Sequence, residues 1–460
     1  GEAQLKIAIA GGGICGALLA SQLSGVPGIE VAVYERCARG ALPPGLNLLV
    51  SHNGMSALAD LDSDVAAKLR SRGWSTSGWK ARTMTGEVLY DIPDVQAVGL
   101  ADSPGLMARW NDVAATMIEA AGESSIHWAT SVQHVEYIPG ENKSSLSVTV
   151  HHHETDRIQT ESDVDLLIAC DGRFSHIRKL VNGVDDLQPS FGPPSIADFR
   201  LVVPDTKPGL IEGLERVYNI PNAEILMREC YSHLYKDADF AIAMEGLVRV
   251  GIGRIQPCEK SDAGLVGIFG NIRMPGGGAA IPEVMKTADG LRALFTPAKG
   301  EKALDDLGRF ILESLCSNAD QIHWNRKQEV SPCYRDKAGR ILFIGDSAGG
   351  FYPSLAQGAT TAIEDACAAA AVLKEFVSCH KGRAMDIPAV TQLIQDLREP
   401  RRSQVAAVSR MHAEHVGLGG LAALEAEAAD WLGTGAGSLP QGEWRKHLQE
   451  VWRGWPRQNE

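Results

Sequence analysis

A glycine-rich loop near the start of the chain, between an apolar strand and an apolar helix, restricts the possible folds more than any other feature. Residues 5–10 are apolar enough for a buried strand, and residues 17–23 form an apolar helical stretch. Between them, Gly11, Gly13 and Gly16 have the spacing G-x-G-x-x-G. Glycines at this spacing permit a tight turn, the approach of a pyrophosphate to the backbone, and close packing of helix on strand. The pattern predicts an α/β fold that binds a dinucleotide.

A second apolar strand, residues 31–34, supports this interpretation because it ends in Glu35. This carboxylate lies 19 residues after Gly16, where it can accept a hydrogen bond from a ribose hydroxyl. We expect Glu35 and the neighbouring Arg36 to contribute to the dinucleotide site.

A similar strand–turn–helix pattern occurs late in the chain. Four apolar residues, 341–344, precede Gly345-Asp346, so a carboxylate stands at the carboxyl end of a buried strand, where open α/β sheets bind ligands. Residues 357–363 then begin a helix with small side chains, whose backbone amides can approach a ligand closely. We predict a second ligand-binding segment here.

Composition excludes several functions. The 460 residues predict two or three domains, and a net charge of -13 argues against nucleic-acid binding, which requires a basic face. The nine cysteines are scattered without a C-x-x-C pair, so we expect reduced thiols and no zinc framework. No apolar run approaches the ~20 residues of a membrane span. Because a strand is expected from residue 5, we expect no signal peptide and a cytoplasmic protein.

The middle of the chain adds further strand ends with polar residues. Asp171-Gly172 follows an apolar strand predicted over 163–170, and Arg109 precedes an amphipathic helix predicted over 111–121. Short strands separated by Pro and Gly turns from about 191 to 271 predict an antiparallel sheet in a separate lobe. Helices are expected over 281–317 and 391–415, and a hairpin over 82–90.

Three other patterns are interpreted as structural. His151, His152 and His153 alternate along a strand end without an acidic or cysteine partner at ligand spacing, which indicates a solvated strand end and no metal site. The glycine-rich residues 417–421 follow a charged helix and not a buried strand, so we expect a flexible connection. Four tryptophans after residue 421 predict a tail that packs on the body or on a partner subunit.

Taken in order, the glycine-rich loop, Asp171-Gly172 and Gly345-Asp346 resemble the class A, single-component FAD-dependent aromatic hydroxylases, the para-hydroxybenzoate and salicylate hydroxylase family. The resemblance extends over residues 5 to 375, and its most specific part is the late motif with Pro353 and Glu364-Asp365-Ala366 at the family's spacing. It implies a Rossmann-like FAD-binding domain of the glutathione-reductase type with an inserted antiparallel-sheet substrate domain and a C-terminal helical region. The implied parts are 1–80, 106–185 and 331–385 (FAD-binding), 81–105 and 186–330 (substrate) and 386–460 (helical).

By this resemblance the early loop and Glu35 hold the ADP half of FAD, Arg109 contacts its diphosphate or ribityl region, and Asp346 binds the ribityl chain. Pro353 is expected beside the isoalloxazine. The segment around Asp171, with Ser175 and Arg178, is associated with both FAD and the reduced nicotinamide. The expected cofactor-binding residues are Gly11, Gly13, Gly16, Glu35, Arg36, Gly45, Arg109, Val132, Asp171, Gly172, Arg178, Gly345, Asp346, Pro353, Gln357, Gly358 and Ala359.

The implied reaction uses the cofactor's chemistry. NADPH or NADH reduces the flavin, O2 adds at its carbon 4a, and the hydroperoxide delivers one oxygen atom to an aromatic or otherwise electron-rich small molecule. The protein excludes water and orients this substrate, as a monomer or homodimer. A base on the substrate lobe would activate a phenol. The candidates are Tyr218, His233 and Tyr235, with Arg200, Tyr231 and Arg249 as further candidates.

Two departures from the family's pattern stand out. Gly45-Leu46-Asn47-Leu48 replaces the common Gly-Ala-Gly-Ile, which predicts different packing at the flavin's edge. Ser347-Ala348-Gly349 replaces Ala-Ala-His, so we expect Gly349 and Gly350 to leave a roomier or less polar pocket beside the isoalloxazine.

Two alternative functions use the same scaffold. One is a flavin-dependent halogenase or prenyl-chain reductase, although the halogenase signature Trp-x-Trp-x-Ile-Pro is absent. The other is a non-catalytic escort protein with a flavin-binding fold, against which the intact late motif argues.

Overall fold

The computed structural model describes most of the chain. The described residues are 5–41, 45–76, 78–93, 105–122, 125–140, 144–183, 195–211, 213–218, 248–255, 264–274, 281, 283–327, 329–353, 356–379 and 386–416. Residues 219–247 and 256–263 of the segment expected to form short antiparallel strands lie outside these ranges, as do the glycine-rich residues 417–421 and the tryptophan-containing tail. No helix within them is long and apolar enough to cross a membrane.

A five-stranded parallel sheet confirms the α/β architecture expected from the two strand–turn–helix patterns. Its strand order is β18-β12-β1-β2-β8, and every neighbouring pair is parallel. The strands are Ile341–Phe343, Leu166–Ala169, Leu5–Ala10, Ile29–Tyr34 and Ile126–His127, in that order.

The register of this sheet brings three motifs to one edge. Ala10 pairs with Ala169, and Ala169 pairs with Phe343. Because parallel strands end at the same side, the glycine-rich loop, Asp171-Gly172 and Gly345-Asp346 all leave the sheet next to one another. Segments that are far apart in the sequence therefore form one ligand-binding edge.

Alternating side chains of β1 belong to two separate apolar cores, as the period of a strand requires. Ile7 and Ile9 pack with the helices on one face, and Ala8 and Ala10 face the small sheet on the other. The helices are α1 (Ile14–Leu23), α5 (Trp110–Ala121) and α11 (Gln357–Cys379), and the small sheet consists of β9 (Thr130–Ile138), β10 (Ser145–His152) and β11 (Arg157–Val164).

The single strand predicted over 163–170 is wrong in one respect, because the chain changes sheets within it. Asp163 has φ +60° and ends β11 together with Val164, whereas β12 begins at Leu166. Between them, Asp165 accepts a hydrogen bond from the backbone N–H of Lys6 at 3.0 Å, which fixes the start of β12 against β1.

A seven-stranded sheet forms the second part of the molecule, in the order β17-β13-β16-β15-β14-β5-β6. Its pairs are antiparallel except for β14 with β5. One face packs on α9 (Ala288–Phe295) and α10 (Asp306–Ser317) through residues such as Phe199, Val250 and Ile268. The strands are His323–Lys327, Ser195–Pro204, Leu265–Met274, Val248–Ile255, Leu214–Tyr218, Gly78–Thr83 and Val88–Pro93, in that order.

The opposite face of this sheet carries glycines where the rest of the chain approaches it. A Cβ atom on Gly267 would lie 2.6 Å from Cβ of Asn47, and one on Gly253 would lie 3.4 Å from Cε of Met107. Asn47 and Met107 come from β3 (Asn47–Val50) and β7 (Leu106–Arg109), which form a three-stranded sheet with β4 (Trp74–Ser75). The glycines thus let this sheet lie directly on the seven-stranded one.

A substitution tests this contact. We expect Gly267→Ala to lower the free energy of unfolding by about 1–3 kcal/mol, because the added methyl group has no space beside Asn47. Gly253→Ala is the matched control. The atoms nearest to its Cβ, at 3.3 and 3.4 Å, are the movable ends of Leu214 and Met107, so the loss there should be smaller. Urea denaturation measures both, and equal losses would contradict the interpretation.

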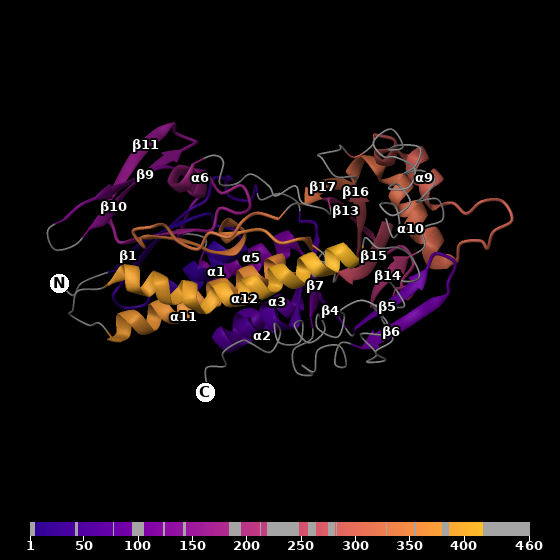
Figure 1. Cartoon of the computed structure of the whole chain (residues 1–460), viewed down its shortest axis with the longest axis horizontal. Helices are drawn as coiled ribbons and strands as arrows, with labels where there is room; N and C mark the ends of the chain where they lie inside the picture. Colours follow the sequence, from indigo (N-terminus) through magenta and orange to yellow (C-terminus); the bar gives the residue numbers. More distant parts are fainter. Residues whose placement is uncertain are drawn as a thin grey trace.

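Helices complete the arrangement shown in Figure 1. The seven-stranded sheet with α9 and α10 lies toward one end of the molecule and the β9–β11 sheet toward the other, while α12 (Ile387–Val416) runs lengthwise in front. Helices α2 (His52–Leu61), α3 (Ser63–Ser71) and α6 (His176–Asn182) are also described, with short 3-10 turns at η4 (Glu283–Lys286), η5 (Ala319–Gln321) and η6 (Gly345–Ala348).

Candidate active site

A cavity of about 440 Å³ lies where the ligand-binding edge of the parallel sheet meets the seven-stranded sheet. Gly13, Gly172 and Asp346 line it from the first side. Asp198, Arg200 and Phe269 line it from β13 and β16. The cavity is therefore assembled from both parts of the fold.

The glycine-rich loop has the close contacts that its spacing predicts. Gly11 has φ +100°, and a Cβ on it would lie 2.5 Å from the carbonyl oxygen of Cys170. A Cβ on Gly16 would lie 1.9 Å from the carbonyl oxygen of Gly11. A Cβ on Gly13 would have a ring carbon of Trp110 as its nearest neighbour, at 3.7 Å. The loop is therefore open on the cavity side.

The start of α1 can bind an anion. Gly13 is the N-cap residue and supplies no side-chain cap, so the first amides of the helix have no such partner. Glu35 is buried and holds the loop: it accepts from Gly12 N at 2.7 Å and from Cys37 N at 2.8 Å. Carboxylate oxygens accept more than one hydrogen bond each, so these contacts leave capacity for a ribose hydroxyl.

Asp346 stands at the carboxyl end of β18 on the cavity wall. Within the described part of the chain, no residue donates a hydrogen bond to its carboxylate, although Gly349 N donates to its backbone carbonyl at 3.3 Å. The turn itself is held by Ser347, whose Oγ lies 2.6 Å from the carbonyl oxygen of Ala169 and accepts from Ile344 N at 3.2 Å. The late motif thus fixes the backbone with Ser347 and leaves the carboxylate of Asp346 for a ligand.

The start of α11 borders the same cavity. Gly358 and Ala359, in its first turn, and Pro353, just before it, are lining residues. Gln357 is buried and accepts from Asn53 Nδ2 at 3.0 Å, so it ties α11 to α2.

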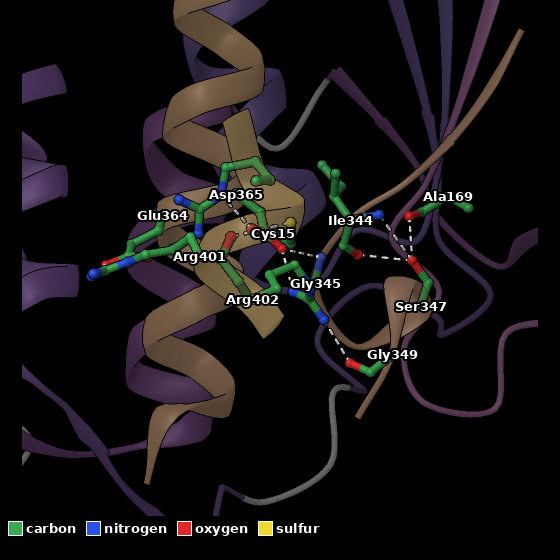
Figure 2. Close-up of polar contacts among 12 residues, drawn as sticks. Cys15, Ala169, Ile344, Gly345, Ser347, Gly349, Glu364, Asp365, Arg401 and Arg402 are labelled. Atoms are coloured by element: carbon green, nitrogen blue, oxygen red, sulfur yellow. Dashed lines mark hydrogen bonds and ion pairs between the residues drawn. The ribbon is translucent and has the colours of Figure 1, made fainter. Parts of the chain in front are cut away.

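A buried ion-pair cluster holds the late motif from behind and was missed by the sequence analysis. Glu364 and Asp365 on α11 face Arg398, Arg401 and Arg402 on α12, and all five are at most 6 % exposed. Figure 2 labels Glu364, Asp365, Arg401 and Arg402 of this cluster. The signal that could have identified it is the spacing of the arginines at i, i+3 and i+4, which places them on one helix face.

Asp365 connects this cluster to the cavity edge. Its carboxylate accepts from Arg398 Nε at 2.8 Å, from Arg402 at 2.5 Å and from Gly345 N at 3.0 Å. Arg402 also donates to the carbonyl of Gly349 at 2.7 Å, as Figure 2 shows. The cluster therefore fixes both ends of the turn that carries Asp346.

Glu364 stays ionised in this buried place. Burial alone would raise its pKa, but Arg398 and Arg401 outweigh it and lower the pKa below the ordinary value. Its oxygens lie 2.8 Å from Arg398 and 2.6 Å from Arg401, and Asn53 donates to it at 2.7 Å.

The motif Asp171-Gly172 is held partly by α6, the helix that follows it. Asp171 Oδ2 accepts from Ile177 N at 3.1 Å, and burial raises the pKa of this carboxyl. Arg178 is fully buried and donates to the carbonyl oxygens of Ser331, at 2.7 Å, and Ser347, at 3.4 Å. Gly172 lines the cavity with φ +80°.

The remaining predicted cofactor residues are dispersed. Arg109 is the N-cap of α5 and forms a two-point ion pair with Asp112, at 2.7 and 2.9 Å. Arg36 is exposed beyond β2, and Val132 is buried in β9. Gly45 packs against Asn111: a Cβ on it would lie 2.4 Å from the backbone nitrogen of Asn111.

The expectation that Gly349 and Gly350 leave room in the pocket is wrong. A Cβ on Gly349, at φ +141°, would lie 3.2 Å from the carbonyl oxygen of Val330, so this glycine is packed against the backbone. A Cβ on Gly350 would lie 2.6 Å from the guanidinium of Arg173, which lines the cavity. The space is filled, and by a charged group.

The candidate bases cannot be placed as a group. His233, Tyr235 and Tyr231 lie outside the described residues, as do the side chains of Tyr218 on β14 and Arg249 on β15. Arg200 is on the cavity wall. His151 on β10 contacts Asp156, in the turn between β10 and β11, at 2.7 Å, and the described residues contain no cluster of metal-ligating side chains.

No protein-family model matches the sequence. Among curated proteins, the chain is similar to 2-heptyl-3-hydroxy-4(1H)-quinolone synthase of Pseudomonas aeruginosa, with 25% identity over 365 residues and 79% of both chains covered. The fold is similar to that of Klebsiella pneumoniae HpxO complexed with FAD and uric acid, with a TM-score of 0.69, 18% identity and coverage of 98% and 97%. It is also similar to 2,6-dihydroxypyridine-3-hydroxylase of Arthrobacter nicotinovorans, with a TM-score of 0.63, 16% identity and coverage of 92% and 95%.

These likenesses confirm the resemblance drawn from the motifs, and with it the prediction of an enzyme of the FAD-dependent monooxygenase type. They also confirm the mixed α/β fold with its parallel and antiparallel sheets.

Proposed function

We propose that this chain, an FAD-dependent monooxygenase by its motifs, fold and relatives, uses FAD and NADPH or NADH to insert one oxygen atom of O2 into an aromatic or otherwise electron-rich small molecule. The reaction is a hydroxylation or an epoxidation. The observation that carries the proposal is the meeting of three sequence motifs at one sheet edge, over a cavity closed on its other side by a second sheet.

The residues at this edge fit FAD. The open side of Gly13 and the uncapped start of α1 suit its pyrophosphate, Glu35 suits a ribose, and the unengaged carboxylate of Asp346 suits the hydroxyls of the ribityl chain. Gly358 and Ala359 offer helix amides to the flavin ring beside Pro353. We include the other predicted cofactor residues in this proposal, with Arg178 acting by positioning the turn after β18.

The bound flavin supplies the activation of oxygen, and the chain's own residues position the substrate and exclude water. The seven-stranded sheet performs this task by closing the cavity with Arg200, Phe269 and Leu214. We further propose the glutathione-reductase-type assignment, with 1–80, 106–185 and 331–385 binding FAD, 81–105 and 186–330 binding substrate, and 386–460 forming a helical region.

The relatives support an aromatic substrate, since their names refer to a quinolone, uric acid and a dihydroxypyridine. These are flat, electron-rich nitrogen heterocycles, and they give the first substrates to assay here.

The test is a reconstitution followed by an assay. The purified chain should bind FAD and consume NADPH or NADH faster when an aromatic substrate is added, and mass spectrometry with ¹⁸O2 should detect one labelled oxygen in the product. A chain that does not retain FAD would contradict the proposal. Flavin binding without any NAD(P)H oxidation would favour an escort protein, and chloride-dependent halogenated product would favour a halogenase.

A further inference from the structure

The wall of the cavity opposite the FAD motifs carries a hydrogen-bond acceptor that the fold leaves unused. Asp198 on β13 is 2 % exposed and lines the cavity. Its Oδ2 is engaged by Arg200 Nε at 3.0 Å, but none of the described residues donates to its Oδ1. A buried carboxylate oxygen without a donor costs free energy, so its retention in a ligand cavity indicates a ligand that donates to it.

Asn47 lines the same cavity and also carries an acceptor that the fold leaves unused. It is 3 % exposed and lines the cavity, and its Oδ1 has no donor among the described residues. Arg200 connects the two residues, because its NH1 donates to the backbone carbonyl of Asn47 at 3.0 Å. Asn47 occupies one of the positions at which this sequence departs from its family, and its side chain fits only because residue 267 is glycine.

The alternation of side chains along β13 directs Asp198 and Arg200 into the cavity. Asp198 and Arg200 are two residues apart and share one face, whereas Phe199 and Leu201 face the core with α9 and α10. The polar pair is therefore built into the sheet and does not depend on a loop.

We propose that Asp198, assisted by Asn47, is the specificity determinant of this enzyme and selects aromatic heterocycles that carry a ring N–H group. The inference rests on the proposed function and names its substrate class. Asp198 accepts the ring N–H, and the carboxamide of Asn47 bonds to a second polar atom of the substrate in the same cavity. A benzoate-type substrate is rejected, because its carboxylate would face that of Asp198 while Arg200 is already held by Asp198 and Asn47.

Binding measurements on the holoenzyme test this inference. The probes are 4(1H)-quinolone, 2-pyridone, their N-methyl derivatives, and salicylate, and the readouts are isothermal titration calorimetry and the change in FAD absorbance. We expect N-methylation to weaken binding about ten- to a hundredfold, because it removes a hydrogen bond to a charged acceptor. Salicylate should bind more weakly than either N–H probe.

One variant weakens the acceptor at residue 198 and a second variant removes it. Asp198→Asn removes the charge at the same size, and Asp198→Val removes both acceptor oxygens while keeping a strand-forming residue. In Asp198→Val, the penalty for N-methylation should fall to less than about threefold. In Asp198→Asn, which keeps a neutral amide oxygen as acceptor, the penalty should lie between this value and that of the unmodified protein. Salicylate should bind to both variants better than to the unmodified protein.

Asp205→Asn is the matched control. Asp205 is also buried on leaving β13, and its partner is Arg254 at 3.4 Å, but it does not line the cavity. This variant should keep the unmodified selectivity.

The inference is overturned if N-methyl and N–H probes bind equally to the unmodified protein, if no N–H probe binds, or if Asp205→Asn alters selectivity as Asp198→Asn does. Calorimetry does not need catalysis, so these outcomes are distinct from a failure to consume NAD(P)H, which concerns the proposed function alone.

Discussion

Replacing Asp346 with asparagine is expected to weaken FAD binding about ten- to a hundredfold, so that the variant loses its yellow colour on gel filtration. The physical reason is that the carboxylate stands on the cavity wall with no donor among the described residues, so its hydrogen bonds are available to the ribityl hydroxyls. Bonds to a charged acceptor contribute about 1.5–3 kcal/mol, which corresponds to this change in affinity.

The stability of the same variant separates a binding role from a structural one. With FAD removed from both proteins, Asp346→Asn should change the free energy of unfolding by less than about 0.5 kcal/mol, since the turn is held by Ser347 and Asp365 instead. Asp320→Asn, at an exposed aspartate, is the control and should retain FAD. Normal FAD affinity in Asp346→Asn would remove the central residue from the proposed site.

A larger effect on stability is expected at Glu364. Glu364→Ala should lower the free energy of unfolding by about 3–5 kcal/mol, because it leaves Arg398 and Arg401 buried without this partner. Urea denaturation measures the change. Glu283→Ala is the matched control: this glutamate pairs with Lys286 at 2.6 Å on the exposed surface, where removal should cost less than about 1 kcal/mol.

The effect of Glu364 should also depend on pH in a defined direction. Its pKa in the folded protein is lower than the ordinary value of 4.5, since the arginines outweigh burial. The stabilisation is therefore complete above the pKa of the unfolded chain and is lost as the pH falls through the lower, folded pKa. The difference in stability between the unmodified protein and Glu364→Gln should be constant near neutral pH and shrink in this acidic range; a difference independent of pH would contradict ionisation of Glu364.

The features predicted best from the sequence are those that residues close together in the chain determine. The glycine spacing of the first loop and the apolar run of β18 are local patterns, and the parallel sheet follows from them because such strands end at one edge. The change of sheet at Asp165 could not be predicted, because it depends on contacts with distant strands: Val164 pairs with β10, whereas Asp165 accepts from the backbone N–H of Lys6.

The side chains that fill the site could not be predicted for a related reason. The interpretation of Gly350 as empty space failed because Arg173, from a distant segment, occupies that space. The two unpaired acceptors of the cavity, Asn47 Oδ1 and Asp198 Oδ1, come from different sheets, and no spacing in the sequence links these residues. Likewise the arginines of α12 have a readable spacing, but only the packing of α12 on α11 identifies their partners.

The face of the seven-stranded sheet that carries Gly253 and Gly267 also limits how chimeras of such enzymes can be built. Asn47 lines the cavity in which we propose that the substrate is selected, and its side chain packs against Gly267 of the seven-stranded sheet. These two residues belong to different segments of the chain. Exchanging the antiparallel lobe between relatives would thus separate a side chain from the gap that accommodates it. A functional chimera of this protein has to inherit β3, β7 and β16 together, because the unit of specificity is the seam between the two sheets and not either sheet alone.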